Sequence, residues 1–178
     1  MHKDIERLYA SEEEIQAVVK KLGEQITKDY EGKEVLFVGV LKGCFMFMAD
    51  IVRACDVMCK VDFMVVSSYG EGTVSTGAVQ IVKDLSENIE GRHVIIVEDI
   101  LDSGNTLSYL VRYMSERKPA SIRIVTLMDK PERRTAPVKA DYVGFTIPDA
   151  FMVGYGLDYQ QRYRNLPYIG ILKPEIYS

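Results

Sequence analysis

Apolar residues along this chain gather in short runs, which polar or glycine-containing segments separate. Runs rich in β-branched residues predict buried strands over residues 35–40, 61–67, 79–82, 94–97, 122–127 and 142–146, with a last apolar stretch at 151–155. Between them, apolar residues at intervals of three and four predict helices over residues 12–26, 45–52 and 107–114. Ser11, followed by acidic residues, is typical of the N-cap of the first of these helices.

Strands that alternate with helices indicate an α/β fold, with a mostly parallel twisted sheet flanked by helices. Ligands of such sheets bind outside the carboxyl ends of the strands. The polar residues that directly follow the predicted strands are therefore the first candidates for a site: Lys42, Ser68-Tyr69, Glu98-Asp99, Asp102 and Lys130. Residues 68–77 are polar and rich in glycine, which is typical of a flexible loop.

Composition narrows the class of protein. The chain has 178 residues, of which 47% are apolar and 27% charged, so we expect one domain over residues 1–178. Its net charge of −4 disfavours nucleic acid or an anionic membrane as a partner. The charged start lacks the apolar run of a signal peptide, and no apolar stretch approaches the roughly 18 residues of a membrane helix.

The cysteines fit a reducing compartment. Cys44, Cys55 and Cys59 are odd in number and lie among apolar residues, so we interpret them as free thiols of a cytoplasmic protein. A metal pair at Cys55 and Cys59 is disfavoured because no further Cys or His lies near them in the sequence.

The strand predicted at 94–97 leads into the most informative segment. It is followed by Glu98, Asp99 and Asp102, then by a Ser-Gly-Asn-Thr turn at 103–106 that opens a helix. The first turn of a helix presents free backbone N–H groups, which suit a phosphate. Carboxylates beside a phosphate repel it unless sugar hydroxyls or a divalent cation intervene. The segment therefore predicts a sugar-phosphate site with a metal nearby.

Other candidates have ordinary structural interpretations when taken singly. Lys42 and Lys130 could be surface lysines, Asp158 could be a cap that pairs with Arg164, and Phe151 could be a packing residue. Motifs of competing phosphate enzymes are absent from the sequence, including Gly-x-Gly-x-x-Gly after a strand and Gly-x4-Gly-Lys-Ser/Thr.

Several segments together resemble one family. Residues 97–107, Val-Glu-Asp-Ile-Leu-Asp-Ser-Gly-Asn-Thr-Leu, resemble the phosphoribosyl pyrophosphate motif of type I phosphoribosyltransferases. Residues 41–43, 68–69, 127–131 and 151–159, with Arg164, resemble in the same order the hypoxanthine(-guanine) phosphoribosyltransferases, especially their bacterial branch. The resemblance implies the type I phosphoribosyltransferase fold, with a small hood region and a flexible active-site loop at Ser68 and Tyr69.

The resemblance also implies a reaction. It is the Mg²⁺-dependent transfer of a 5-phosphoribosyl group from phosphoribosyl pyrophosphate to N9 of hypoxanthine, and of guanine, which gives the nucleotide and pyrophosphate in purine salvage. Asp102 would face N7 of the purine as general base or acid. Residues Ser103, Gly104, Asn105 and Thr106 would bind the 5′-phosphate.

The remaining roles divide between sugar, pyrophosphate and base. Glu98 and Asp99 would hold the ribose hydroxyls, directly or through Mg²⁺, and Asp158, one of the purine-binding residues, would bind a second Mg²⁺ that engages pyrophosphate. Lys42, Gly43 and Arg164 would bind pyrophosphate, with a cis peptide bond before Lys42. In the base pocket, Lys130 would donate to the 6-oxo group, Phe151 would stack on the ring, and the Met152 backbone would accept from its edge.

The sequence departs from the family pattern at two positions, and two alternative functions stand beside this one. Ser103 stands where Thr is common, and Met152 stands where Val or Ile is common, which leaves the preference between hypoxanthine and guanine open. One rival is a regulator of this fold that binds RNA or DNA, and the other is an enzyme for xanthine or a pyrimidine. The resemblance also implies a homodimer or homotetramer.

Overall fold

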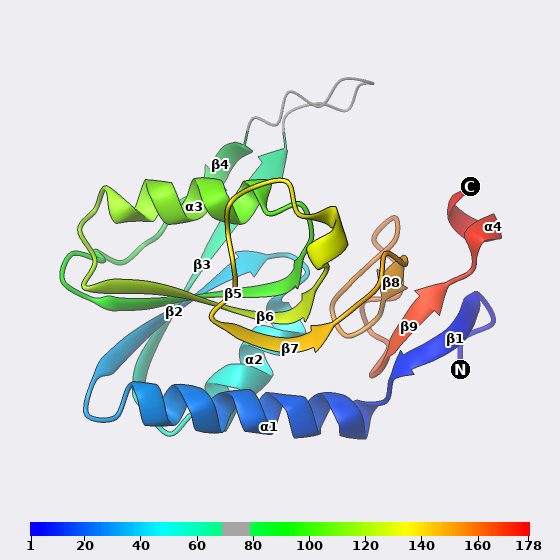
Figure 1. Ribbon diagram of the computed structural model, residues 1–178, viewed down its shortest axis with the longest axis horizontal. Helices are drawn as coiled ribbons and strands as arrows, with labels where there is room; N and C mark the ends of the chain where they lie inside the picture. The colour runs from blue at the N-terminus through cyan, green and yellow to red at the C-terminus, as the bar shows by residue number, and fades with distance from the viewer. Residues whose placement is uncertain (69–78) are drawn as a thin grey trace.

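The computed structural model describes residues 1–68 and 79–178, and its largest element is a twisted, six-stranded sheet of order β4-β3-β2-β5-β6-β7 (Figure 1). The strands span Glu34–Leu41 (β2), Met58–Ser68 (β3), Val79–Lys83 (β4), His93–Leu101 (β5), Ser121–Asp129 (β6) and Tyr142–Thr146 (β7). All neighbours pair in parallel except β3 and β4. The predicted α/β fold with a mostly parallel sheet is confirmed.

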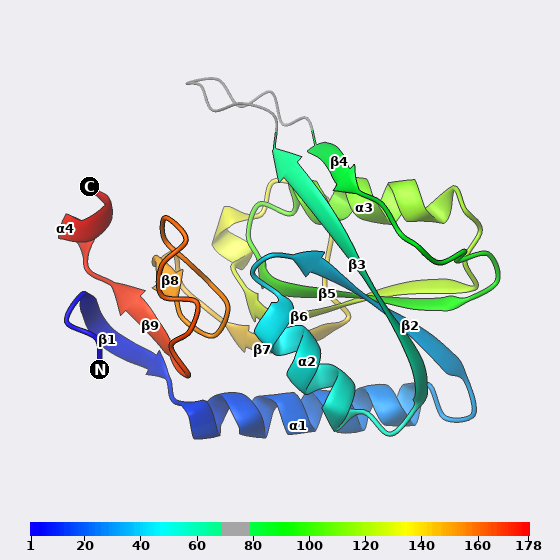
Figure 2. The same cartoon turned by 180° about the vertical axis from the view of Figure 1, so that it is seen from behind.

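Helices cover both faces of this sheet. α1 (Glu12–Asp29) and α2 (Phe45–Ala54) lie on one face, and α3 (Asn105–Ser115) lies on the other (Figures 1 and 2). The central strand β5 is therefore apolar on both sides: Ile95 packs with the α1 and α2 layer, whereas Ile96 packs with the α3 layer. Ser11 and Glu14 form a capping box at the start of α1, as the sequence predicts.

A second sheet lies beyond the carboxyl ends of the parallel strands (Figure 1). It pairs β1 (Ile5–Ala10), β9 (Ile169–Leu172) and β8 (Met152–Val153) in the order β1-β9-β8, all antiparallel. The sequence patterns predict neither β1 nor β9. β1 is buried only at its two ends, Ile5 and Ala10, and pairs with a strand from the other end of the chain, so local periodicity gives little signal for it.

The remaining differences lie at element ends. β5 continues to Leu101, so Glu98 and Asp99 lie within the strand and not after it, because β6 continues to pair with β5 as far as Asp129. A short 3-10 turn, η1 (Pro131–Arg133), follows β6, and a last helical turn, α4 (Pro174–Tyr177), follows β9. No helix in the described ranges is long and apolar enough to cross a membrane.

Candidate active site

The chain turns sharply where β2 ends. The peptide bond between Leu41 and Lys42 is cis, as the resemblance implies. The next residue, Gly43, packs against the Asp99 side chain, and a Cβ at this position would lie inside the van der Waals radius of Asp99 Oδ2. A glycine is therefore needed here because the carboxylate of β5 occupies the space that a side chain would take.

The loop after β5 carries Asp102, Ser103 and Gly104 into α3. Gly104 has φ +83° and forms the N-cap of α3, without a side chain that caps the helix. Asn105 N donates to Ser103 Oγ at 3.4 Å, whereas the next N–H groups of α3 have no side-chain cap and are available to a ligand. They border a cavity of about 260 Å³, lined by residues 40–43, 66, 98–104, 106 and 107. A helix N-terminus that opens into a cavity suits a phosphate.

The segment that follows β6 holds this loop in place through its backbone carbonyl groups. Leu101 O accepts from Lys130 N at 2.9 Å, and Ser103 O accepts from the amides of Thr135 and Ala136 at 2.9 and 3.1 Å. Between them, Asp102 O accepts from Arg134 Nε at 3.0 Å. These contacts fix the backbone of residues 101–103, which line the first cavity.

We call these contacts between residues 130–136 and the carbonyl groups of residues 101–103 the clamp, and Arg134 is its central residue. Its guanidinium donates to Leu101 O at 3.2 Å and to Val138 O at 2.9 Å, and it forms an ion pair with Asp129 at the end of β6. The side chains of Arg134 and Asp129 are only 17% and 19% exposed. A charged group with this many partners fixes the loop far better than a solvated arginine does.

Glu98 and Asp99 form a carboxylate pair at the floor of the first cavity. Burial, followed by the negative charge of Asp99, raises the pKa of Glu98 well above its usual value. Burial also raises the pKa of Asp99, although its hydrogen bond with Glu98 and the charge of Arg164 act in the opposite direction. Glu98 is therefore the member that holds a proton most readily, and the pair would accept a cation or hydroxyl donors.

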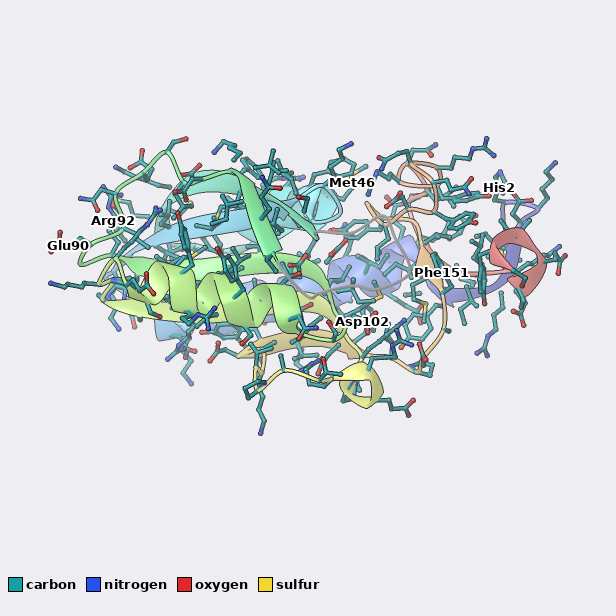
Figure 3. The ribbon with its side chains drawn as sticks, turned by 90° about the horizontal axis from the view of Figure 1, so that it is seen from above. His2, Met46, Glu90, Arg92, Asp102 and Phe151 are labelled. Atoms are coloured by element: carbon teal, nitrogen blue, oxygen red, sulfur yellow. The ribbon has the colours of Figure 1, made fainter. Side chains whose placement is uncertain are left out.

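A second cavity, of about 550 Å³, lies beside the first. It is lined by Asp99, Ile100, Asp102, Lys130, Arg133, Asp149, Ala150, Phe151, Met152, Leu157, Asp158 and Tyr177. The two cavities share Asp99, Ile100 and Asp102, so Asp102 lies where they meet. Figure 3 shows Asp102 and Phe151 between the large sheet and the small sheet, with Glu90 and Arg92 at the far end of the molecule.

The walls of the second cavity combine a buried cation with aromatic rings. Lys130 is 8% exposed, and its Nζ lies 3.4 Å from Asp149 Oδ1. The ring of Phe151 stacks on Tyr177, with centroids 4.8 Å apart and planes 26° apart. Met152 is buried in β8, which is an edge strand, so one side of its backbone is not used by the small sheet. A flat heterocycle with a carbonyl group fits these walls.

The cations expected to bind pyrophosphate are joined by one glutamine. Gln161 Oε1 accepts from Lys42 Nζ at 3.4 Å and from Arg164 Nη2 at 3.1 Å. Arg164 also forms an ion pair with Asp158 at 2.9 Å. Asp158 Oδ2 accepts from the backbone N–H of Gln161 at 2.8 Å. The loop after β8 thus brings Arg164 to Lys42 from a distant part of the sequence.

The structure brings most of the residues predicted from the sequence to these two cavities. Asn105 begins α3 and is exposed. Ser68 is the last residue of β3, and Tyr69 lies outside the described residues. Within the described part of the chain, no group of three or more His, Cys, Asp or Glu side chains is arranged as a metal site. Glu98 and Asp99 lie together, whereas Asp158 is engaged with Arg164.

Sequence reasoning missed five residues that contribute to the site: Arg133, Arg134, Asp149, Gln161 and Tyr177. Arg133 and Arg134 follow Lys130 within one short turn, and Asp149 stands two residues before Phe151. Closeness to predicted site residues was therefore a usable signal for these three. For Tyr177, only the pairing of β9 with β8 reveals its position.

Comparisons with known proteins agree with this geometry. A family model described as a phosphoribosyl transferase domain matches residues 5–160. The hypoxanthine-guanine phosphoribosyltransferase of Bacillus subtilis is 58% identical over 178 residues, which cover 100% of this chain and 99% of that protein. The crystal structure of a hypoxanthine phosphoribosyltransferase from Staphylococcus aureus has a TM-score of 0.96 and 55% identity, and covers 100% of this chain and 97% of that one.

A further relative is longer. The bifunctional protein TilS/HprT of Listeria innocua is 57% identical over the whole of this chain, but the chain spans only 28% of that protein's length.

Proposed function

Because this chain belongs to the phosphoribosyltransferase family, among its hypoxanthine-guanine members, we propose that it catalyses purine salvage. The reaction is the transfer of a 5-phosphoribosyl group from phosphoribosyl pyrophosphate to N9 of hypoxanthine and guanine, with IMP and GMP as products. The relatives named above as hypoxanthine-guanine and hypoxanthine phosphoribosyltransferases support the substrate class.

The single observation that carries the proposal is the meeting of two cavities at Asp102. One cavity has a helix N-terminus suited to phosphate, and the other has a buried lysine and a stacked aromatic wall. A sugar phosphate in the first cavity and a base in the second would meet beside the Asp102 carboxylate. Joining two such ligands is the chemistry of phosphoribosyl transfer.

On the sugar side, Ser103, Gly104, Asn105 and Thr106 bind the 5′-phosphate through the N-terminus of α3. Glu98 and Asp99 accept hydrogen bonds from the ribose hydroxyls. Lys42, Gly43 and Arg164 bind the departing pyrophosphate, and the link from Lys42 through Gln161 to Arg164 supports their acting together.

On the base side, Lys130 donates to the 6-oxo group and Phe151 stacks on the ring. An ammonium group can only donate, so it favours a 6-oxopurine over adenine, whose 6-amino group also donates. Met152 offers its backbone carbonyl to the edge of the ring, and Asp158 lies at the same cavity wall.

In the reaction, the N9–C1′ bond forms while the C1′–oxygen bond to pyrophosphate breaks. The base gives up its N7 proton to Asp102, which acts as general base, and pyrophosphate leaves with the bonding electrons. Positive charge develops at C1′ and negative charge at pyrophosphate, so the carboxylates on one side and the cations on the other stabilise the transition state electrostatically.

Magnesium fits the residues present in the first cavity. Mg²⁺ uses one or two carboxylates together with substrate oxygens and water, and does not need a complete protein cage. Glu98 and Asp99 are such a pair, and their burial with raised pKa values means that a nearby cation would lower the cost of their charge. When bound, Mg²⁺ would neutralise charge on the pyrophosphate. Asp158 is the candidate for a second ion, provided that Arg164 releases it.

The further expectations are a homodimer or homotetramer, and neither nucleic acid nor membrane as a partner. The test of function incubates the protein with phosphoribosyl pyrophosphate, Mg²⁺ and one base at a time, and follows nucleotide formation. We expect turnover with hypoxanthine and guanine, and little with adenine or uracil. Absence of turnover with both 6-oxopurines would refute the proposal, and turnover that is confined to xanthine or uracil would favour the rival enzymes.

A further inference from the structure

Charged side chains alternate in sign along one wall of the second cavity. Asp102 Oδ1 lies 3.4 Å from Arg133 Nε, Arg133 Nη1 lies 3.5 Å from Asp149 Oδ2, and Asp149 Oδ1 lies 3.4 Å from Lys130 Nζ. All four line this cavity. The chain of charges therefore connects the expected general base to the expected donor for the 6-oxo group.

The two oxygens of Asp102 have different surroundings. Oδ1 is shut off from solvent and, among the described residues, has no hydrogen-bond donor. Its nearest cation is the Arg133 guanidinium. The side chain as a whole is 41% exposed, so Oδ2 is the oxygen that a ligand in the cavity can reach. The Arg133 guanidinium thus lies on the Oδ1 side of the carboxylate and leaves Oδ2 to a bound base.

Arg133 is itself held in place from two directions. It closes the turn η1, where its amide donates to Lys130 O at 3.2 Å and Pro131 fixes the backbone at the first position. Asp149 then contacts both Arg133 and Lys130 with its two oxygens. Asp149 is placed by the chain after β7, where the Ile147 amide donates to Asp129 O at 2.9 Å.

We propose that Arg133 is a positioning residue for Asp102, and that Asp149 holds Arg133 and Lys130 at the spacing that the N7 and 6-oxo edge of a purine requires. This inference rests on the proposed function. A carboxylate without a fixed partner rotates, and the base then meets the productive orientation in only a fraction of encounters. The ion pair from Arg133 restricts that rotation and keeps Oδ2 toward the base.

The position of Arg133 makes the proposal testable without unfolding the protein. Its side chain is 56% exposed, and ion pairs with such exposure contribute little to stability. Arg133→Gln should therefore fold with an unchanged thermal midpoint. Arg53→Gln is the matched control, since Arg53 is also exposed and paired with an aspartate, Asp50, away from both cavities.

The experiment measures kcat and both KM values for the wild type, Arg133→Gln, Arg133→Lys and Arg53→Gln. We expect Arg133→Gln to lower kcat with hypoxanthine on the order of tenfold to a hundredfold, the loss typical of a misplaced catalytic group. KM for phosphoribosyl pyrophosphate should stay within a factor of two or so, since its cavity does not include Arg133. Arg133→Lys should lose less kcat than Arg133→Gln, and Arg53→Gln should match the wild type.

A double-mutant cycle separates positioning from a general structural effect. If Arg133 acts through Asp102, then Arg133→Gln should have no further effect on the residual kcat of an Asp102→Asn enzyme. Equal losses in both backgrounds, or wild-type kinetics for Arg133→Gln, would overturn the inference. The wild type is assayed first: its failure to form nucleotide refutes the proposed function, whereas turnover with an inert Arg133 refutes the positioning role alone.

Discussion

Replacing Arg134 by Met tests how strongly the loop after β5 depends on its clamp. The substitution keeps a long apolar stem but removes the guanidinium, and with it the donors to Leu101 O, Asp102 O and Val138 O. It also leaves Asp129 without its ion-pair partner. Because Asp129 is only 19% exposed, water replaces that partner poorly.

These contacts set the loss of unfolding free energy that we expect for Arg134→Met. Breaking a buried ion pair by removing one partner costs about 3–5 kcal/mol. The pair here is largely but not completely buried, and Leu101 O keeps its bond from Lys130 N, so the lower end of that range, about 3 kcal/mol, applies. With a urea dependence of about 2 kcal/mol per molar, the unfolding midpoint should fall by about 1.5 M.

The assay is urea unfolding followed by far-ultraviolet circular dichroism, with kcat measured on the folded protein. Arg53→Met is the control for loss of an exposed pair and should shift stability by less than about 0.5 kcal/mol. In the double variant Arg134→Met with Asp129→Asn, no charge is left unpaired, so we expect at least about 2 kcal/mol of the loss to be recovered. If Arg134→Met alone lowers the free energy of unfolding by less than about 1 kcal/mol and leaves kcat unchanged, then Arg134 does not hold the loop in place.

Three more predictions concern the acidic residues of the first cavity and of its junction with the second. Asp102→Asn should lower kcat about 10²–10⁴-fold while binding of phosphoribosyl pyrophosphate, measured by calorimetry, is largely kept; equal loss of both would make Asp102 a binding residue. Gly43→Ala should displace the Asp99 carboxylate and reduce kcat/KM at least about tenfold; wild-type kinetics would show that the contact yields freely. Burial raises the folded-state pKa of Glu98 above its unfolded value of 4.5, so this residue favours folding below that pH and the benefit is lost as pH rises through the folded pKa. In the Glu98→Gln variant, the free energy of unfolding should therefore decline less steeply with pH above 4.5. An unchanged slope would contradict a raised pKa of Glu98 in the folded state.

The elements that sequence reasoning recovered are those with a local signal. The apolar runs of β2, β5 and β6 are buried on both faces, so nearly every position is apolar and the strand is evident from composition alone. The start of α1 was predicted because Ser11 and Glu14 satisfy each other's backbone amides within one turn. The order strand, acids, turn and helix around Asp102 is likewise local, so it indicates a sugar phosphate without help from any family resemblance.

The elements that were missed depend on contacts between distant residues. β1 exists because Ile5 pairs with Leu172 at the other end of the chain, and only the two end residues of β1 are buried. The sequence places Gly43 beside Lys42 in the pyrophosphate site, but the Asp99 side chain that lies where a Cβ of Gly43 would be is a contact no spacing could suggest. Tyr177 reaches the stacking wall only because β9 carries the end of the chain past Phe151.

The segment after β6 shows why the two halves of the site cannot be treated as independent. Its backbone and Arg134 bind the carbonyl groups of residues 101–103, which line the first cavity. The same short segment carries Lys130 and Arg133 into the second cavity. A change in its conformation would therefore alter phosphate binding, the orientation of Asp102 and recognition of the base together. Residues 130–136 therefore organise the site as much as Glu98, Asp99 and Asp102 at the end of β5 do.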